Sequence, residues 1–89
     1  MSDDNVMRVA PKTDVKTLGA AIAHAIYEGH EPVLRCVGAG ALNQAVKGSV
    51  VANTFIAQRG MSLALRPGME SVQGHTEEIS AITLRVCKI

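Results

Sequence analysis

Aromatic residues are nearly absent from this 89-residue sequence, which contains one tyrosine, one phenylalanine and no tryptophan. Its hydrophobic core must therefore be built from aliphatic side chains and methionine. Proteins that bind single-stranded nucleic acid usually stack the bases on aromatic side chains, and Tyr27 and Phe55 offer little for that purpose.

A strong excess of one charge is also missing. Nine lysines and arginines stand against eight aspartates and glutamates, which gives a formal net charge of +1. A protein that packages DNA in bulk is expected to be strongly basic, so the net charge does not favour that class. Any binding of nucleic acid must depend on where the cations lie.

Cysteine is scarce, and long apolar runs are absent. Cys36 and Cys87 lie far apart, and the three histidines have no metal-ligand spacing with them, so we expect reduced thiols, no metal and no cofactor. The first residues are polar and acidic, unlike a secretory signal, and no apolar run approaches the roughly 20 residues of a membrane span. The sequence therefore predicts a cytoplasmic protein that does not enter a membrane.

The spacing of apolar residues predicts a single domain over residues 1–89 with six elements. We expect strands at 5–10 and 32–37, a helix from a cap at Thr13 or Asp14 to a left-handed Gly29, a helix at 41–58, and strands at 61–66 and 79–89. This order, β-α-β-α-β-β, indicates a two-layer α/β sandwich with a four-stranded mixed sheet and both helices on one face. The other face must be solvated or bound to a partner.

Two segments are expected to lie outside the regular core. Residues 1–5 are expected to be disordered. Pro67 and Gly68 are expected to break the preceding strand, so that the mostly polar stretch 68–78 forms a mobile hairpin arm.

The two predicted helices differ in composition. The first contains Gly19 and several alanines, which make it narrow enough to approach the sheet closely. The apolar residues of the second cover more than half of its circumference, more than one packed face needs. That excess suggests contact with a second subunit, although a helix covered on all sides by the core would have the same pattern.

The run GAGALNQAVK at residues 38–47 lies where a strand passes into a helix. Free backbone N–H groups and the positive end of the helix dipole favour an anion there, and Asn43 and Lys47 lie one turn apart on the same helix face. A dinucleotide-binding fingerprint would need a glycine in place of Asn43 and a later acidic residue, so that interpretation is rejected. Spacing alone leaves two interpretations open: the glycines form a contact with phosphate, or they only make a tight turn and allow the helix to pack closely.

The same run resembles the signature of the stage V sporulation protein S family. Arg8 and Val9, the small-residue run GAAIA at 19–23 and the run ITL at 82–84 fall where that family has counterparts. The resemblance covers residues 6–89. The family is similar in turn to Alba, an archaeal chromatin protein with this order of elements that forms dimers and binds DNA or RNA.

The resemblance implies three contacts with nucleic acid: the loop after the first strand, the loop that begins the second helix, and the hairpin arm. The arm departs from this pattern, because it carries Glu70, Glu77 and Glu78 with only His75 as a possible cation. Arg35 is a further possible member of the basic patch. The residues expected to bind nucleic acid are Arg8, Lys12, Lys16, Gly38, Gly40, Asn43 and Lys47.

We therefore expect a homodimeric, non-enzymatic regulator that binds DNA or RNA through phosphates, with weak sequence selectivity and a role in sporulation or a related programme. No arrangement of nucleophile, base or paired carboxylates suggests catalysis. The alternative is a protein-interaction module that does not bind nucleic acid, which the near-neutral charge and the acidic arm would favour.

Overall fold

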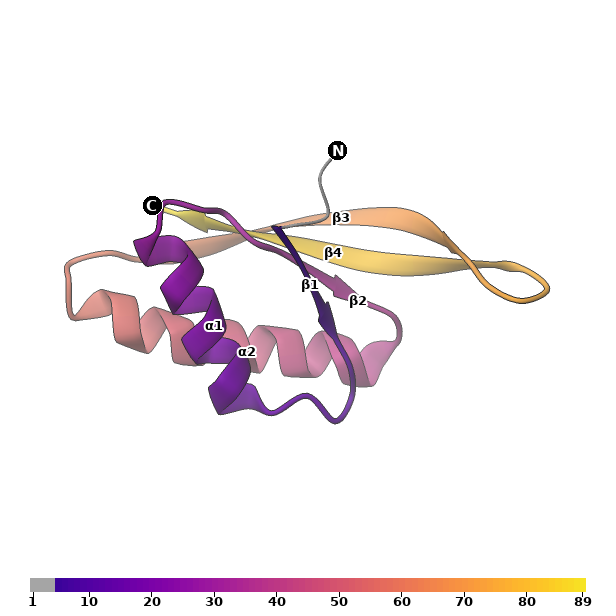
Figure 1. Ribbon diagram of the computed structural model, residues 1–89, viewed down its shortest axis with the longest axis horizontal. Helices are drawn as coiled ribbons and strands as arrows, with labels where there is room; N and C mark the ends of the chain where they lie inside the picture. Colours follow the sequence, from indigo (N-terminus) through magenta and orange to yellow (C-terminus); the bar gives the residue numbers. More distant parts are fainter. Residues whose placement is uncertain (1–4) are drawn as a thin grey trace.

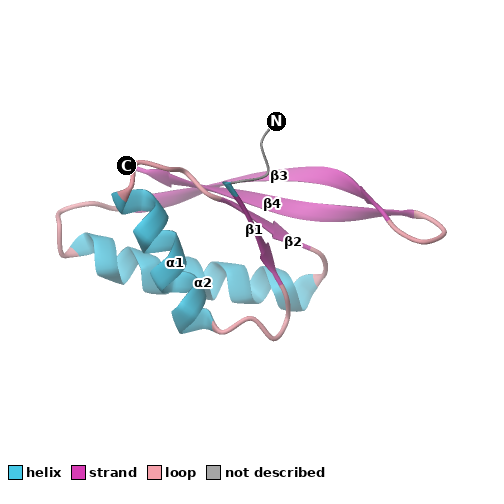
Figure 2. Ribbon diagram, in the orientation of Figure 1, coloured by secondary structure: helices cyan, strands magenta, loops and turns pink. Residues whose placement is uncertain are grey.

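The computed structural model describes residues 5–89 and has the predicted order of elements (Figure 1). The elements are β1 (Val6–Val9), α1 (Val15–Tyr27), β2 (Val33–Cys36), α2 (Ala39–Ala57), β3 (Leu63–Gln73) and β4 (Glu78–Lys88). The strands form one sheet in the order β1-β2-β4-β3, with β1 parallel to β2 and the other two pairs antiparallel. Both helices lie on one face of the sheet (Figure 2), so the predicted two-layer architecture is confirmed.

Local hydrogen bonds set the two ends of α1. Asp14 caps its start and accepts from the backbone N–H of Thr17 at 2.9 Å and from the Thr17 hydroxyl at 2.8 Å. At the other end Gly29 has φ 85°, and the N–H of His30 donates to the carbonyl of Ala25 at 2.9 Å. This is the left-handed termination predicted from the glycine.

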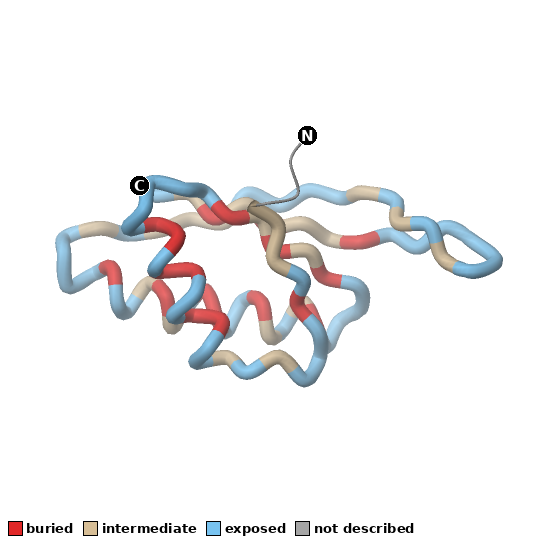
Figure 3. Tube along the Cα trace, viewed as in Figure 1, coloured by how far each residue is buried: buried red, intermediate tan, exposed pale blue. Residues whose placement is uncertain are grey.

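The core is aliphatic, as the composition requires. The largest fully buried apolar side chains are those of Ile22, Leu34, Ile56 and Val86. They come from both helices and from β2 and β4, and Figure 3 shows buried residues on each of these elements. The thiol of Cys36 belongs to this core, and burial raises its pKa.

Small residues bring the two helices together. A Cβ added at Gly19 would lie 2.5 Å from Cγ1 of Val51 and 3.0 Å from the carbonyl oxygen of Gly48, and a Cβ at Gly48 would lie 2.6 Å from Cδ2 of Leu18. The expectation that small residues let α1 approach the sheet therefore needs correction, because at Gly19 the close approach is to α2.

The hairpin differs from the prediction. Pro67 and Gly68 do not break the strand, because β3 pairs with β4 without interruption from Leu63 opposite Lys88 to Gln73 opposite Glu78. β3 is an edge strand, where a proline without an N–H group is tolerated. The arm predicted at 68–78 is therefore an extension of the sheet, and it projects beyond the helices (Figure 1). Its mobility stays a prediction.

The predicted disorder of residues 1–5 concerns residues that, apart from Asn5, lie outside the described part of the chain. The side-chain amide of Asn5 donates to the carbonyl of Glu31 at 2.6 Å. This bond joins the start of β1 to the loop before β2.

Replacing Gly19 with alanine tests the helix contact. On an exposed helix position this change would stabilise the fold by about 1 kcal/mol. At Gly19 we expect urea denaturation to show a destabilisation of about 1–3 kcal/mol, because the added carbon meets a stiff β-branched side chain and a backbone carbonyl. Ala20→Gly, at an exposed neighbouring position, measures the helix propensity alone. A Gly19→Ala variant more stable than the wild type would contradict the contact.

Candidate nucleic-acid interface

Two loops meet at one edge of the sheet. Because β1 and β2 are parallel, their carboxyl ends lie together, and so do the 10–14 loop and the start of α2 (Figure 1). The side-chain amide of Gln44 donates to the carbonyl of Thr13 at 2.9 Å. A Cβ at Gly40 would lie 3.2 Å from the Cβ of Pro11, so the glycine allows the loop to pack closely on the helix. We call this region the loop edge.

The start of α2 has no capping side chain. Gly38 is the N-cap residue with φ 91°, a conformation that favours glycine, and the first turn contains no acidic residue. Residues 38–40 are exposed. The start of the helix, with the residues Ala39 and Gly40 and the positive end of the helix dipole, therefore lies at the surface, where it can bind an anion.

The start of α1 differs, because the negative charge of its capping residue Asp14 offsets the positive end of the helix dipole. The Thr17 hydroxyl and then the Thr17 backbone N–H hold the pKa of Asp14 below its usual value, and the charge of Lys16 also lowers it. The Asp14 carboxylate thus occupies the first turn of α1. Of the two helix starts at the loop edge, that of α2 is the one left open to an external anion.

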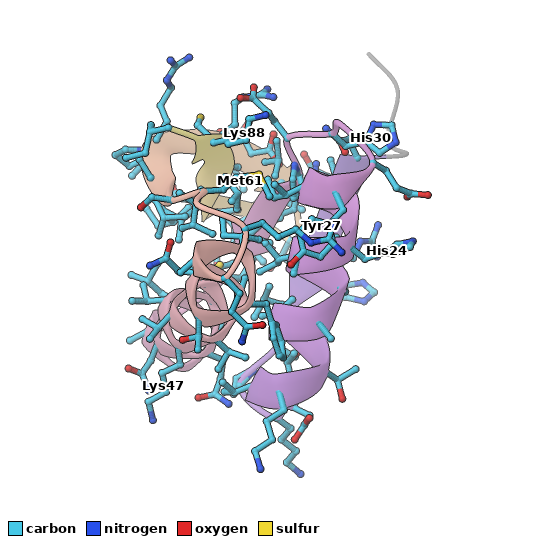
Figure 4. All side chains as sticks on the ribbon, turned by 90° about the vertical axis from the view of Figure 1, so that its left-hand side faces the viewer. His24, Tyr27, His30, Lys47, Met61 and Lys88 are labelled. Atoms are coloured by element: carbon cyan, nitrogen blue, oxygen red, sulfur yellow. The ribbon has the colours of Figure 1, made fainter. Side chains whose placement is uncertain are left out.

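Most of the predicted binding residues lie at or near the loop edge. Lys12 is exposed in the loop after β1, and Lys16 is exposed in the first turn of α1. Asn43 and Lys47 are exposed on α2, and Figure 4 shows Lys47 pointing away from the sheet. Lys12 and Lys16 thus lie on the loop and the helix start at the loop edge, while Asn43 and Lys47 lie about one and two turns along α2.

Arg8 is not part of this group. Along β1, Met7 and Val9 pack into the core between the sheet and the helices, so Arg8 lies on the opposite face of the sheet. We call this helix-free side the open face. Arg8 pairs in register with Arg35, and Arg66 pairs with Arg85 on the same face.

The sequence reasoning missed Arg66 and Arg85. The alternation of side chains in each strand indicates which face they occupy, but their position beside Arg35 depends on strand order and register. Those two properties become visible only in the folded sheet.

The acidic arm has two parts. Glu70 forms an ion pair with Arg35 across the sheet, so its charge is offset by a cation of the same domain. Glu77 and Glu78 are exposed near the tip. The tip therefore keeps the negative character expected from the sequence.

The aromatic residues lie away from the loop edge, at the other ends of the helices. The hydroxyl of Tyr27 donates to the carbonyl of Phe55 at 3.2 Å, and the guanidinium of Arg59 lies 4.0 Å from the centre of the Tyr27 ring. Figure 4 shows Tyr27 at that end of the molecule. Neither ring can stack a base at the loop edge.

Helix α2 leaves apolar side chains uncovered. Val46 is 43% exposed and Val50 is 62% exposed. Both line a groove of about 280 Å³ between α2 and β3, together with Leu63 and Leu65. The excess of apolar residues on this helix is therefore at the surface and not covered by the core.

The described residues contain no group of three or more histidine, cysteine or acidic side chains that could hold a metal ion. Over the same residues, no helix combines the length and apolar character needed to cross a membrane.

Comparisons with known proteins concern the family and the fold of the chain. A sequence model of the stage V sporulation protein S family matches residues 5–89. Alba from Thermoplasma volcanium has a similar structure, with a TM-score of 0.62 over 92% of this chain and 98% of the Alba chain. The two sequences are 17% identical, so this likeness shows the fold alone.

The cap of α1 gives a pH-dependent prediction. An aspartate whose pKa is depressed by folding stabilises the fold above its unfolded pKa, and this contribution is lost as the pH falls through the folded pKa. We expect Asp14→Ala to lower the Tm at pH 7, with the difference from the wild type shrinking below about pH 4.

Asp14→Asn is the matched control, because it keeps a cap acceptor that does not titrate. Thermal unfolding followed by circular dichroism measures all three proteins. A wild-type advantage over Asp14→Ala that stays constant from neutral to strongly acidic pH would contradict the role of the carboxylate.

Proposed function

The chain belongs to the stage V sporulation protein S family, and from this we propose that it is a nucleic-acid-binding regulator that holds phosphates at the loop edge. The observation that carries the proposal is the uncapped, exposed start of α2 beside the loop with Lys12. By family resemblance, its role is in sporulation or a related developmental programme.

The contacts in this proposal are electrostatic. The backbone N–H groups of the first turn of α2 donate to phosphate oxygens, Asn43 adds a side-chain donor, and Lys12, Lys16 and Lys47 supply positive charge. Phosphate contacts fix the position of a protein on nucleic acid but carry no sequence information. Binding is therefore weakly sequence-selective and open to both DNA and RNA.

We also propose that the protein acts as a homodimer through α2. The groove beside Val46 and Val50 supports this, because its apolar walls would be buried by an identical surface. A dimer would present two loop edges to one nucleic acid. It would thereby compensate for the low net charge of a single chain.

A specific observation favours a second candidate function. The acidic arm tip and the apolar groove suit a surface that recruits another protein without contacting nucleic acid. The tip would repel phosphates, so on this alternative the lysines at the loop edge are ordinary solvated side chains.

The proposal predicts a steep dependence of binding on salt. We expect the affinity for a short DNA duplex to fall linearly with salt on logarithmic axes, and Lys12→Ala or Lys47→Ala to make the slope shallower by about 0.9 each. Fluorescence anisotropy with DNA and RNA of one sequence measures both. The control is Arg59→Ala, which removes a cation at the far end of α2. Undetectable binding at low salt would reject the proposal and favour the protein-interaction alternative.

The dimer gives a separate prediction. Light scattering at micromolar concentration is expected to give twice the chain mass of 9.4 kDa. Val50→Glu should yield the monomer, because it places a charge in an apolar interface, and Ala20→Glu on the exposed face of α1 should not. A wild-type mass of 9.4 kDa would contradict the dimer.

A further inference from the structure

Four arginines form a track across the open face. Arg8 and Arg35 are register partners on β1 and β2, and Arg66 and Arg85 are partners on β3 and β4. Arg35 lies opposite Thr83, so Arg85 is its diagonal neighbour at about 7–8 Å. The track therefore contains one arginine from each strand of the sheet.

This arrangement is not explained by the stability of the fold. Like charges directly opposite each other on neighbouring strands are destabilising, and the sheet contains two such pairs on one face. Among the strand residues on this face, Glu70 is the one carboxylate, and its ion pair is with Arg35. Within the described chain, Arg8, Arg66 and Arg85 form no ion pair. The open face thus carries positive charge that the protein itself does not offset.

The track also passes a hollow of mixed character. A depression of about 290 Å³ is lined by Arg8, Arg35, Val37 and Val72. Its lining thus combines two arginines with valines. A guanidinium plane can stack on a nucleobase, and valines can contact the apolar faces of its ring.

The short residues between the arginines are closely packed. A Cβ at Gly68 would lie 2.8 Å from Oγ1 of Thr83, so a larger residue at this position would collide with its cross-strand neighbour. Ala81, further along the same face, is buried. Since Ala81 is covered and the Thr83 hydroxyl fills the space beside Gly68, the arginine side chains offer the groups that a ligand on this face would contact.

We propose that the open face is a binding surface for single-stranded nucleic acid, with the phosphodiester backbone following the arginine track and a base in the hollow. This rests on the proposed function and names a further surface and substrate form for it. Arginine supplies here both the charge and the planar stacking group that the two aromatic residues, at the other end of the helices, cannot provide.

Two features favour a single strand over other polyanions. A duplex bends only over long distances, so one segment cannot follow both the loop edge and the open face, whereas a single strand can turn from one to the other. An acidic protein segment would satisfy the guanidinium groups, but it offers no ring for the hollow between Val37 and Val72.

Near Arg85 the track also reaches further residues with hydrogen-bond donors. Arg85 also lines a hollow of about 470 Å³ with Asn5, His30 and Lys88. Glu31 lines the same hollow and partly offsets its positive charge. The nucleic-acid strand would therefore be held most firmly along the four arginines and less firmly in this hollow.

The test is the double variant Arg66→Gln/Arg85→Gln, measured by fluorescence anisotropy on a single strand of about 16 nucleotides and on the duplex of the same sequence. We expect at least tenfold weaker binding of the single strand at low salt. The slope of log affinity against log salt concentration should become shallower by about 1.4, because each of the two lost phosphate contacts contributes about 0.7. Duplex affinity should change less than twofold.

Two controls accompany this variant. Arg59→Gln removes a cation outside the track and should leave both affinities unchanged. Thermal unfolding shows that the double variant is folded, and its Tm should be equal to or above that of the wild type because two opposed like charges are removed.

The outcomes separate the two proposals. If the double variant binds the single strand as the wild type does, while Lys12→Ala still weakens duplex binding, the open-face surface is wrong and the proposed function stands. If the wild type binds neither nucleic acid at low salt, the proposed function fails and this inference with it. If the double variant instead loses binding of a polyglutamate peptide while single-strand binding persists, the face takes an acidic protein segment, which also overturns the proposal.

Discussion

Parallel pairing of β1 with β2 places the carboxyl ends of both strands, and therefore the starts of both helices, at the same edge of the sheet. The loop edge exists because of this pairing. Gln44 and Gly40 then fix the loop against α2, one by a hydrogen bond and the other by the absence of a side chain. Asp14 caps α1 and leaves the start of α2 as the open anion site.

The same topology determines what happens on the open face. Each β-α unit places its helix on the same side of the sheet, and the close contact at Gly19 and Gly48 lets both helices fit there. The other side has no helix to cover it. Its arginines face each other in register, an arrangement that lowers stability unless an anion offsets the charge. The two surfaces thus follow from one chain topology, although they differ in chemistry.

Much of the fold could be predicted from the sequence because local patterns specify it. Helical spacing predicted both helices, and Gly29 predicted the end of α1. The apolar residues over more than half of α2 left open a second subunit or a helix covered on all sides, and the exposed Val50 shows that the core does not cover this helix. The hairpin could not be predicted in full. A proline disrupts a central strand but is tolerated in an edge strand, and whether the strand with Pro67 lies at the edge depends on the strand order of the whole sheet. For the same reason the sequence placed Arg8 with the lysines, whereas register places it beside Arg35.

The central claim is that phosphate binds at the uncapped start of α2, and amide chemical shifts measure this most directly. A ¹⁵N-labelled sample titrated with a short DNA duplex at low salt should show its largest shifts at the amides of Ala39, Gly40 and Ala41, with smaller ones at Lys12 and Lys47. Adding salt should reverse them together. Unchanged amides over Ala39–Ala41 while resonances elsewhere shift, or no shifts anywhere, would contradict the account.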